Sequence, residues 1–244
     1  RILAIVLPRP ALFRLALAGA MIARPFRRLM PGRLKGLVGM APRQLPSPSA
    51  VDRPQTFPAQ GKRRMRVALL NGCAQRVLDP TINEATVRLL TRLGAEVIVA
   101  KGAGCCGALA HHMGKTDAAH AQAAANITAW MREEARAGID RIVINTSGCG
   151  TTVKDYGFMF RDDPEHAAAA ARISERARDL TELVDELGFE PSASVPPLRI
   201  AYHSACSMQH GQKITTLPGK LLKRAGFDVC AVPEGHICCG SAGT

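Results

Sequence analysis

The sequence has no long uninterrupted apolar run, although its first 44 residues are rich in leucine, isoleucine and alanine. Pro8, Pro10 and Arg14 divide the apolar segments there, so no stretch approaches the ~20 apolar residues that a membrane-spanning helix needs. A secretory signal peptide also requires one continuous apolar core, and the same residues interrupt it. The sequence therefore predicts neither a spanning helix nor a secretory signal.

Acidic residues are nearly absent from the first 66 positions, which hold 14 Lys and Arg residues and one acid, Asp52. These positions carry a charge of +13, and the remaining 18 basic and 19 acidic residues sum to −1. A nucleic-acid-binding protein needs its basic patch on a recognition fold. Here the positive charge lies among Pro and Leu residues, which favours an anionic membrane surface or an acidic partner and argues against nucleic acid.

The sequence contains neither a Ser/His/Asp order nor a pair of carboxylates that would indicate a hydrolytic site. It does contain a cysteine pattern that occurs twice. Each copy has a lone cysteine followed by an adjacent pair: Cys73, Cys105 and Cys106, then Cys206, Cys238 and Cys239. Both copies have 31 residues between the lone cysteine and the pair. Residues 89–94 and 221–226 are similar as well. Such an internal repeat indicates that one supersecondary unit is used twice.

The eight cysteines do not suit a disulfide framework. Adjacent cysteines cannot readily bridge each other without strain, and the chain is far larger than a disulfide-stabilised secreted domain. In a reducing compartment, clustered thiols more often indicate metal or redox chemistry. Cys230 lies inside a predicted strand, where we expect a buried core thiol.

Composition divides the chain into four predicted parts: a basic amphipathic leader (1–44), a Pro-rich linker (45–64), a first repeat unit (65–197) and a second repeat unit (198–244). Two interpretations of the leader remain open. It could rest on a membrane or partner surface, or pack on an upstream part of its own chain. The chain begins with Arg1 and stops directly after the second cysteine pair, so we expect a fragment whose second unit is truncated.

From residue 65 onward the sequence predicts strands that alternate with helices, as in a parallel sheet covered by helices. Strands are expected at 66–70, 96–100, 141–145, 198–202 and 228–232, and helices at 81–93, 117–137, 167–187 and 217–225. The predicted fold class is therefore α/β, with two repeated parallel-sheet units after a helical basic leader.

This arrangement brings the cysteines of one unit together. Cys73 follows the first predicted strand, Cys105 and Cys106 follow the second, and Cys149 follows the third. The carboxyl ends of parallel strands share one edge of the sheet, where ligands bind. Four thiolates there could hold zinc or an iron–sulfur cluster. Adjacent thiolates suit several irons better than one zinc ion, so a zinc-stabilised interaction module is the weaker alternative.

These features resemble the cysteine-rich CCG domains of the heterodisulfide reductase type, and among them the iron–sulfur subunits of glycolate oxidase. Residues 104–114, 147–157, 210–213 and 238–244 carry the closer match. The resemblance spans essentially the whole chain. It implies an upstream ferredoxin-like domain and a flavin-bearing partner, with FAD, that oxidises glycolate to glyoxylate and passes electrons to this chain.

The resemblance also implies which residues hold [4Fe–4S] clusters: Cys73, Cys105, Cys106 and Cys149, then Cys206, Cys238 and Cys239. Thr146 stands where the fullest family pattern has another cysteine. His111 and His112 follow the first pair and are expected to be solvated or capping residues. The implied protein is a cytoplasmic electron-transfer subunit, peripheral on the inner membrane, with a quinone-side acceptor. Heterodisulfide-reductase-like and lactate-utilisation subunits remain the alternatives.

Overall fold

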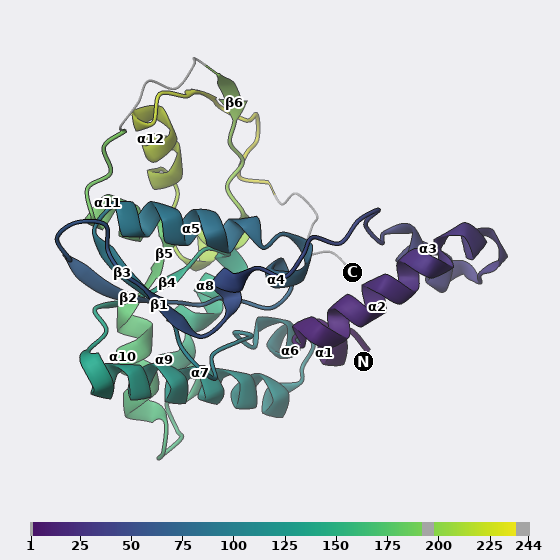
Figure 1. Ribbon diagram of the computed structural model, residues 1–244, viewed down its shortest axis with the longest axis horizontal. Coiled ribbons are helices and arrows are strands. Elements are labelled where there is room, and N and C mark those ends of the chain that lie inside the picture. The colour runs from purple at the N-terminus through teal and green to yellow at the C-terminus, as the bar shows by residue number, and fades with distance from the viewer. Residues whose placement is uncertain (1, 192–197, 238–244) are drawn as a thin grey trace.

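A computed structural model describes residues 2–191 and 198–237. Its main body is a five-stranded sheet between two layers of helices, and a helical arm extends from one side (Figure 1). A smaller two-stranded sheet with its own helix lies against one of these layers. The structure confirms the predicted α/β class.

The main sheet is parallel except for one edge strand. Its strands, in spatial order, are β1 (Gln55–Phe57), β3 (Ala95–Val99), β2 (Met65–Leu69), β4 (Arg141–Ile144) and β5 (Ala177–Asp179). β1 pairs antiparallel with β3, and the other pairs are parallel. The three strands predicted for the first unit are present within one residue of their expected bounds. β1 and β5 were not predicted.

Residues of the central strands alternate between two apolar cores. One layer contains α5 (Thr81–Arg92) and α11 (Leu180–Glu186), and the other contains α7 (Thr116–Ala137), α9 (Tyr156–Met159) and α10 (Ala167–Arg176). Val67 and Leu69 pack in the core of the first layer, whereas Ala68 and Leu70 pack in the core of the second. Because both faces of the sheet are covered, residues 67–70 form an unbroken apolar run rather than an alternation of apolar and polar residues.

The single helix expected over residues 167–187 is wrong, because α10 and α11 are separated by β5. Asp179 ends the strand and caps the next helix. Its carboxylate accepts a hydrogen bond from the Thr181 amide at 2.8 Å, and the Glu182 carboxylate accepts one from the Asp179 amide at 2.8 Å. This capping box satisfies backbone donors at the start of a helix, so the chain can extend before Asp179 and pair with β4.

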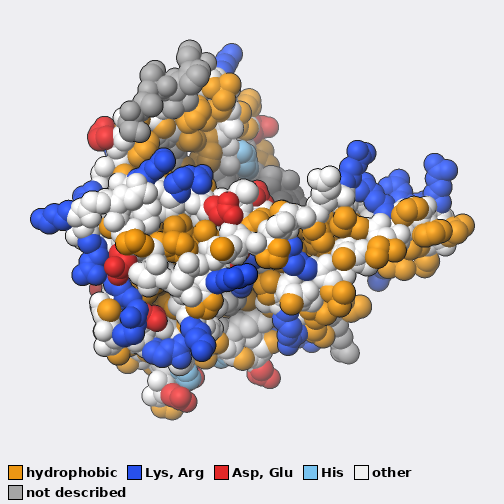
Figure 2. Space-filling model, viewed as in Figure 1, with side chains coloured by type: hydrophobic (Ala, Val, Ile, Leu, Met, Phe, Trp, Pro, Cys, Tyr) orange, Lys and Arg blue, Asp and Glu red, His pale blue; other side chains and the backbone are white. Residues whose placement is uncertain are grey.

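The N-terminal segment forms the arm. It contains α1 (Ile2–Val6), α2 (Pro10–Ala23), the 3-10 helix η1 (Arg24–Leu29) and α3 (Gly32–Gly39). The Arg14 guanidinium attaches α2 to the body, donating to the Pro46 carbonyl at 2.6 Å and to the Arg76 carbonyl at 3.0 Å. Figure 2 shows apolar and cationic side chains next to each other along the arm, where Leu15 and Phe26 are exposed. Within the described ranges, no helix is long and apolar enough to cross a membrane.

The segment expected to be a linker takes part in the fold. It contains the 3-10 helix η2 (Ala50–Asp52) as well as β1. The Asp52 side chain is buried beside α5, and β1 closes one edge of the main sheet. The division of the chain into four parts stays a prediction, and its boundary at residue 197 falls outside the described residues.

The second unit contains the parallel strands β6 (Arg199–Ala201) and β7 (Asp228–Cys230), the π-helix η3 (Ser207–Gly211) and α12 (Leu217–Arg224). None of the six strand residues is buried, unlike most residues of β2, β3 and β4 in the main sheet. The expectation of a buried core thiol at Cys230 is therefore wrong. Its sulfur is only half-buried and accepts a hydrogen bond from Arg199 Nε at 2.8 Å.

Candidate cluster-binding site

Three loops bring the cysteines of the first unit to the carboxyl edge of the main sheet. Cys73 follows β2 and precedes α4 (Gln75–Leu78). Cys105 and Cys106 follow β3 and precede α6 (Ala108–His112). Cys149 follows β4, in the first turn of α8 (Ser147–Lys154). The edge is thus assembled from segments that are 32 or more positions apart in the sequence.

The four thiols form a continuous row at this edge. Cys73 is hydrogen-bonded to Cys105, Cys105 to Cys106, and Cys106 to Cys149. Cys105 and Cys106 are buried, with 8% and 2% of their surface exposed, and the two outer cysteines are half-buried. We call these four side chains the thiol row.

Contact between the thiols opposes their ionisation. The hydrogen bond with Cys106, together with burial, raises the pKa of the Cys105 thiol to about 11. The hydrogen bond with Cys105, together with burial, also raises the pKa of Cys73. For Cys106, the hydrogen bond with Cys105 lowers the pKa, but the one with Cys149 and burial leave it well above its ordinary value. Several thiolates could therefore share this edge only with positive charge among them.

Backbone amides are also directed at the sulfurs. The Ala108 amide donates to Cys106 Sγ at 3.4 Å, the Gly107 amide donates to the Cys105 sulfur, and the Ala74 amide donates to the Cys73 sulfur. N–H donors of this kind favour thiolates and tune the reduction potentials of iron–sulfur clusters.

The donor set suits an iron–sulfur cluster. Its sulfur ligands are soft, and adjacent thiolates can bind different irons of one cluster. Within residues 2–191 and 198–237, no three His, Cys, Asp or Glu side chains are arranged to hold a single metal ion. What the structure places together is a row of four sulfurs, each next to another.

Two buried polar residues hold the loop of the cysteine pair. Asn126 of α7 accepts a hydrogen bond from the Gly104 amide at 2.7 Å and donates to the Cys105 carbonyl at 2.8 Å. The Tyr156 hydroxyl donates to the Cys106 carbonyl at 2.8 Å. Sequence reasoning assigned neither residue a role. A signal existed for Asn126, because it lies in phase with the buried apolar residues of α7.

A side-chain network joins the loops of the two outer cysteines. Thr146 donates to Gln75 Oε1 at 2.5 Å, and Gln75 Nε2 donates to Asn83 at 2.6 Å and to Asn145 at 2.9 Å. Asn83 in turn donates to the Asp52 carboxylate at 2.7 Å. The hydroxyl of Thr146 therefore connects these loops.

Residues 67–154 and 200–244 match the model of the CCG family, the cysteine-rich domain. The chain belongs to this family. The two matched regions correspond to the two copies of the cysteine pattern, so the CCG unit is the supersecondary unit that the repeat indicates.

Known proteins of this kind are similar over most of the chain. It is 40% identical to the "Glycolate oxidase iron-sulfur subunit" of Escherichia coli, over 98% of this chain and 55% of that protein. It is 28% identical to the "Probable glycolate oxidase iron-sulfur subunit" of Bacillus subtilis, over 88% and 48%. It is 32% identical to "Lactate utilization protein A" of Bacillus velezensis, over 74% of both chains. The chain thus spans about half the length of the two glycolate oxidase relatives.

The other predicted site residues are not part of the thiol row as the structure describes it. Cys206 precedes η3 in the second CCG unit, and Cys238 and Cys239 fall outside the described residues. His111 and His112 are both exposed at the end of α6, as expected for solvated side chains.

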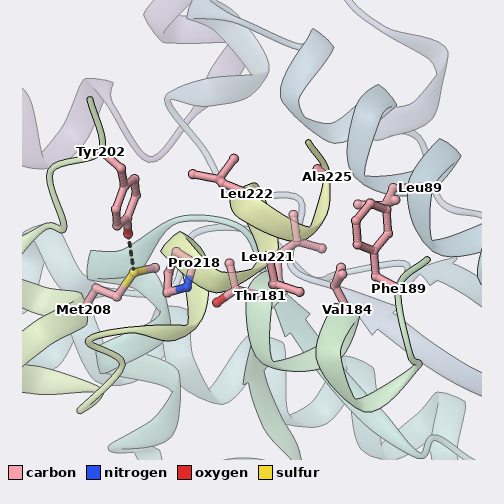
Figure 3. Close-up of a pocket in the computed structure, with 11 residues that line it drawn as sticks. Leu89, Thr181, Val184, Phe189, Tyr202, Met208, Pro218, Leu221, Leu222 and Ala225 are labelled. Atoms are coloured by element: carbon pink, nitrogen blue, oxygen red, sulfur yellow. Dashed lines mark hydrogen bonds between the residues drawn. The ribbon is translucent and has the colours of Figure 1, made fainter. Parts of the chain in front are cut away.

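A cavity of about 370 Å³ lies between the two CCG units (Figure 3). It is lined by apolar side chains of α5, α11 and α12, including Leu89, Val184 and Leu221. The Tyr202 hydroxyl is directed at Met208 Sδ, 3.3 Å away, so this polar group is already bonded. No cysteine lines the cavity, and it is separate from the thiol row.

The glycine of the first CCG motif has a backbone that only glycine adopts readily. Gly107 has a φ of +92°, and a Cβ there would lie 2.8 Å from the Ala119 carbonyl of α7. We expect Gly107→Ala to lower the free energy of unfolding by about 1–3 kcal/mol, from the left-handed backbone and the clash with α7. Denaturant titration measures this loss.

Gly114→Ala is the matched control. Gly114 also has a positive φ, +66°, but nothing lies within 4 Å of its added Cβ. It should lose only about 1 kcal/mol, the backbone part of the effect. Equal losses in the two variants would contradict the contribution of α7 to the CCG loop.

Asp52 makes part of the stability pH-dependent. Burial raises its pKa above 3.8, against the hydrogen bond from Asn83 and the charge of Arg76. Protonated Asp52 contributes its full share to the free energy of unfolding when the pH is below the ordinary pKa of an aspartate. This contribution is lost as the pH rises through the raised pKa of the folded protein. Asp52→Asn keeps an acceptor for Asn83 and should remove this decline. Urea titrations of both proteins between about pH 4 and pH 7 should therefore diverge. Asp162 is exposed, so Asp162→Asn should give a curve of unfolding free energy against pH that runs parallel to the wild-type curve. A parallel curve for Asp52→Asn would contradict the assignment of this pH dependence to Asp52.

Proposed function

We propose that this chain is the iron–sulfur electron-transfer part of a glycolate oxidase (glycolate dehydrogenase) complex. The thiol row is the observation that carries the proposal, because it collects four sulfur donors at the ligand-binding edge of a parallel sheet. The identity to glycolate oxidase iron–sulfur subunits over nearly the whole chain supports the choice of complex.

In this proposal Cys73, Cys105, Cys106 and Cys149 hold a [4Fe–4S] cluster in the first CCG domain, residues 65–197. Cys206, Cys238 and Cys239 contribute to a second site, in residues 198–244. A bound cluster supplies one-electron transfer at a potential that its surroundings set. The protein supplies the ligands, the backbone donors to sulfur and a dry core behind the buried pair. It needs no general acid or base, because electron transfer depends on potential and distance.

The proposed partner is a flavin subunit, with FAD, that oxidises glycolate to glyoxylate and reduces this chain. The acceptor is on the quinone side, and the complex is cytoplasmic and peripheral on the inner membrane. The arm supports a peripheral position, because residues 1–44 hold eight arginines, one lysine and no acid. Exposed apolar side chains lie among these cations, as at surfaces that contact anionic lipid headgroups.

A lactate-oxidising complex is the second candidate function. One observation favours it: the match to the lactate utilization relative covers 74% of that protein, a larger share than the 55% and 48% of the two glycolate oxidase relatives. The two candidates share the thiol row and differ in the substrate of the partner subunit.

Metal content tests the thiol row. In anaerobically purified full-length protein we expect iron and acid-labile sulfide, with a large fraction lost in Cys106→Ser, because Cys106 lies between two other ligands of the row. Cys230→Ser is the matched control, since Cys230 lies in β7 with Arg199 as its partner. It should retain the wild-type content. Zinc without iron would overturn the electron-transfer proposal in favour of a zinc-stabilised module, and unchanged iron in Cys106→Ser would place the clusters elsewhere.

Substrate reduction separates the two candidate complexes. The native complex, purified with its flavin subunit, should lose the visible absorbance of its oxidised clusters when glycolate is added anaerobically. L-lactate at the same concentration should reduce them much more slowly. The opposite order would assign the chain to lactate oxidation while leaving the electron-transfer role intact.

A further inference from the structure

The Cys206 segment of the second CCG unit is bound to the helix that carries Cys149. Ser207 and Ser147 share a hydrogen bond between their hydroxyls at 2.9 Å. Gln212 Nε2 donates to the Ser147 carbonyl at 2.9 Å. Ser147 is the first residue of α8, two positions before Cys149. We call these bonds the η3–α8 contact.

The η3–α8 contact is so close that a side chain at either of two glycines would displace a neighbouring side chain. A Cβ at Gly150 would lie 2.6 Å from Gln212 Nε2, and a Cβ at Gly211 would lie 2.8 Å from Thr151 Cγ2. Thr151 also donates to the Ser207 carbonyl at 3.0 Å. The two glycines therefore allow the segments that follow the two cysteines to touch.

The local backbone is unusual where Gln212 reaches α8. The backbone N–H of Gln212 donates to the Ser207 carbonyl at 3.0 Å. This bond closes a π-turn, a geometry often found at functional sites. Lys213 follows with a φ of +61°, a left-handed conformation that costs a non-glycine residue free energy. The π-turn and the left-handed residue after it together set the direction in which the Gln212 side chain leaves the backbone.

We propose that Gln212 is a positioning residue for Cys149 and that the η3–α8 contact couples the two cysteine sites. By holding the Ser147 carbonyl, Gln212 fixes the first turn of α8 and hence the place of the Cys149 sulfur at the end of the thiol row. The second CCG unit thereby sets the ligand geometry of the first. This inference rests on the proposed function for its effect on a cluster, but the positioning itself concerns the protein alone.

Gln212→Ala tests the positioning in full-length protein. After removal of metal, Cys149 should react with iodoacetamide roughly fivefold to tenfold faster, because the loss of a hydrogen bond releases the first turn of α8. In the iron-loaded protein, the midpoint potential of the first-unit cluster should shift from the wild-type value while the iron content stays the same. A merely structural role would change stability without moving the potential.

Gln209→Ala is the matched control. Gln209 lies in η3, three positions before Gln212, but donates to the carbonyls of Ser204 and Gly235, both within the second CCG unit. Neither the reactivity of Cys149 nor the potential should change in this variant. Equal effects from Gln209→Ala and Gln212→Ala would show general loosening of η3 and would overturn the specific role of Gln212.

Gly150→Ala provides an independent variant that leaves Gln212 in the sequence. The added Cβ would occupy the place of the side-chain amide of Gln212. Alanine favours a helix by about 1 kcal/mol over glycine, so this variant should fold. It should reproduce the effects of Gln212→Ala and add nothing in the double variant. Additive effects, or wild-type reactivity and potential in Gln212→Ala, would overturn the inference. A wild-type protein without iron would instead overturn the proposed function, and the reactivity of Cys149 would still decide the positioning.

Discussion

Contact between four thiols is the constraint on which this structure depends. Thiols in contact and out of water resist ionisation, so the row favours a ligand that brings positive charge and soft acceptor orbitals. The same contact dictates how the surrounding loops are built. The loop of the cysteine pair shows both devices, because Gly107 permits close backbone approach and Asn126 of the neighbouring α7 is a buried polar clamp.

The clamps explain why the site is rigid although it lies on loops. The loop of the cysteine pair is held from the helical layer behind it by Asn126 and Tyr156, and the outer loops are joined by Gln75 and Asn145. A buried polar group that loses its hydrogen-bond partner destabilises the protein, so conformations of the loops that break these bonds are disfavoured.

Much of the fold follows from patterns that can be recognised in the sequence. The buried strands are short apolar runs, and the helices between them end at glycines such as Gly94 and Gly138, so most of the strands and helices that were predicted lie within a residue or two of their expected bounds. The break at Asp179 was missed because the alanine-rich helix before it continues smoothly in composition. β1 was missed because its three residues lie among prolines and pair only through tertiary contact with β3.

The α/β class, the repeat and the convergence of Cys73, Cys105, Cys106 and Cys149 could be derived from the sequence, because the alternation of strands and helices is visible along the chain and the loops that follow parallel strands meet at one edge of the sheet. Tertiary structure alone decided which polar side chains hold that edge. Asn126, Tyr156 and Gln212 reach the cysteine loops from helices and from the second unit, across 21 to 65 positions of sequence. Such partners are selected by distance in space, and a hydrogen bond between remote segments leaves no periodic pattern in the chain.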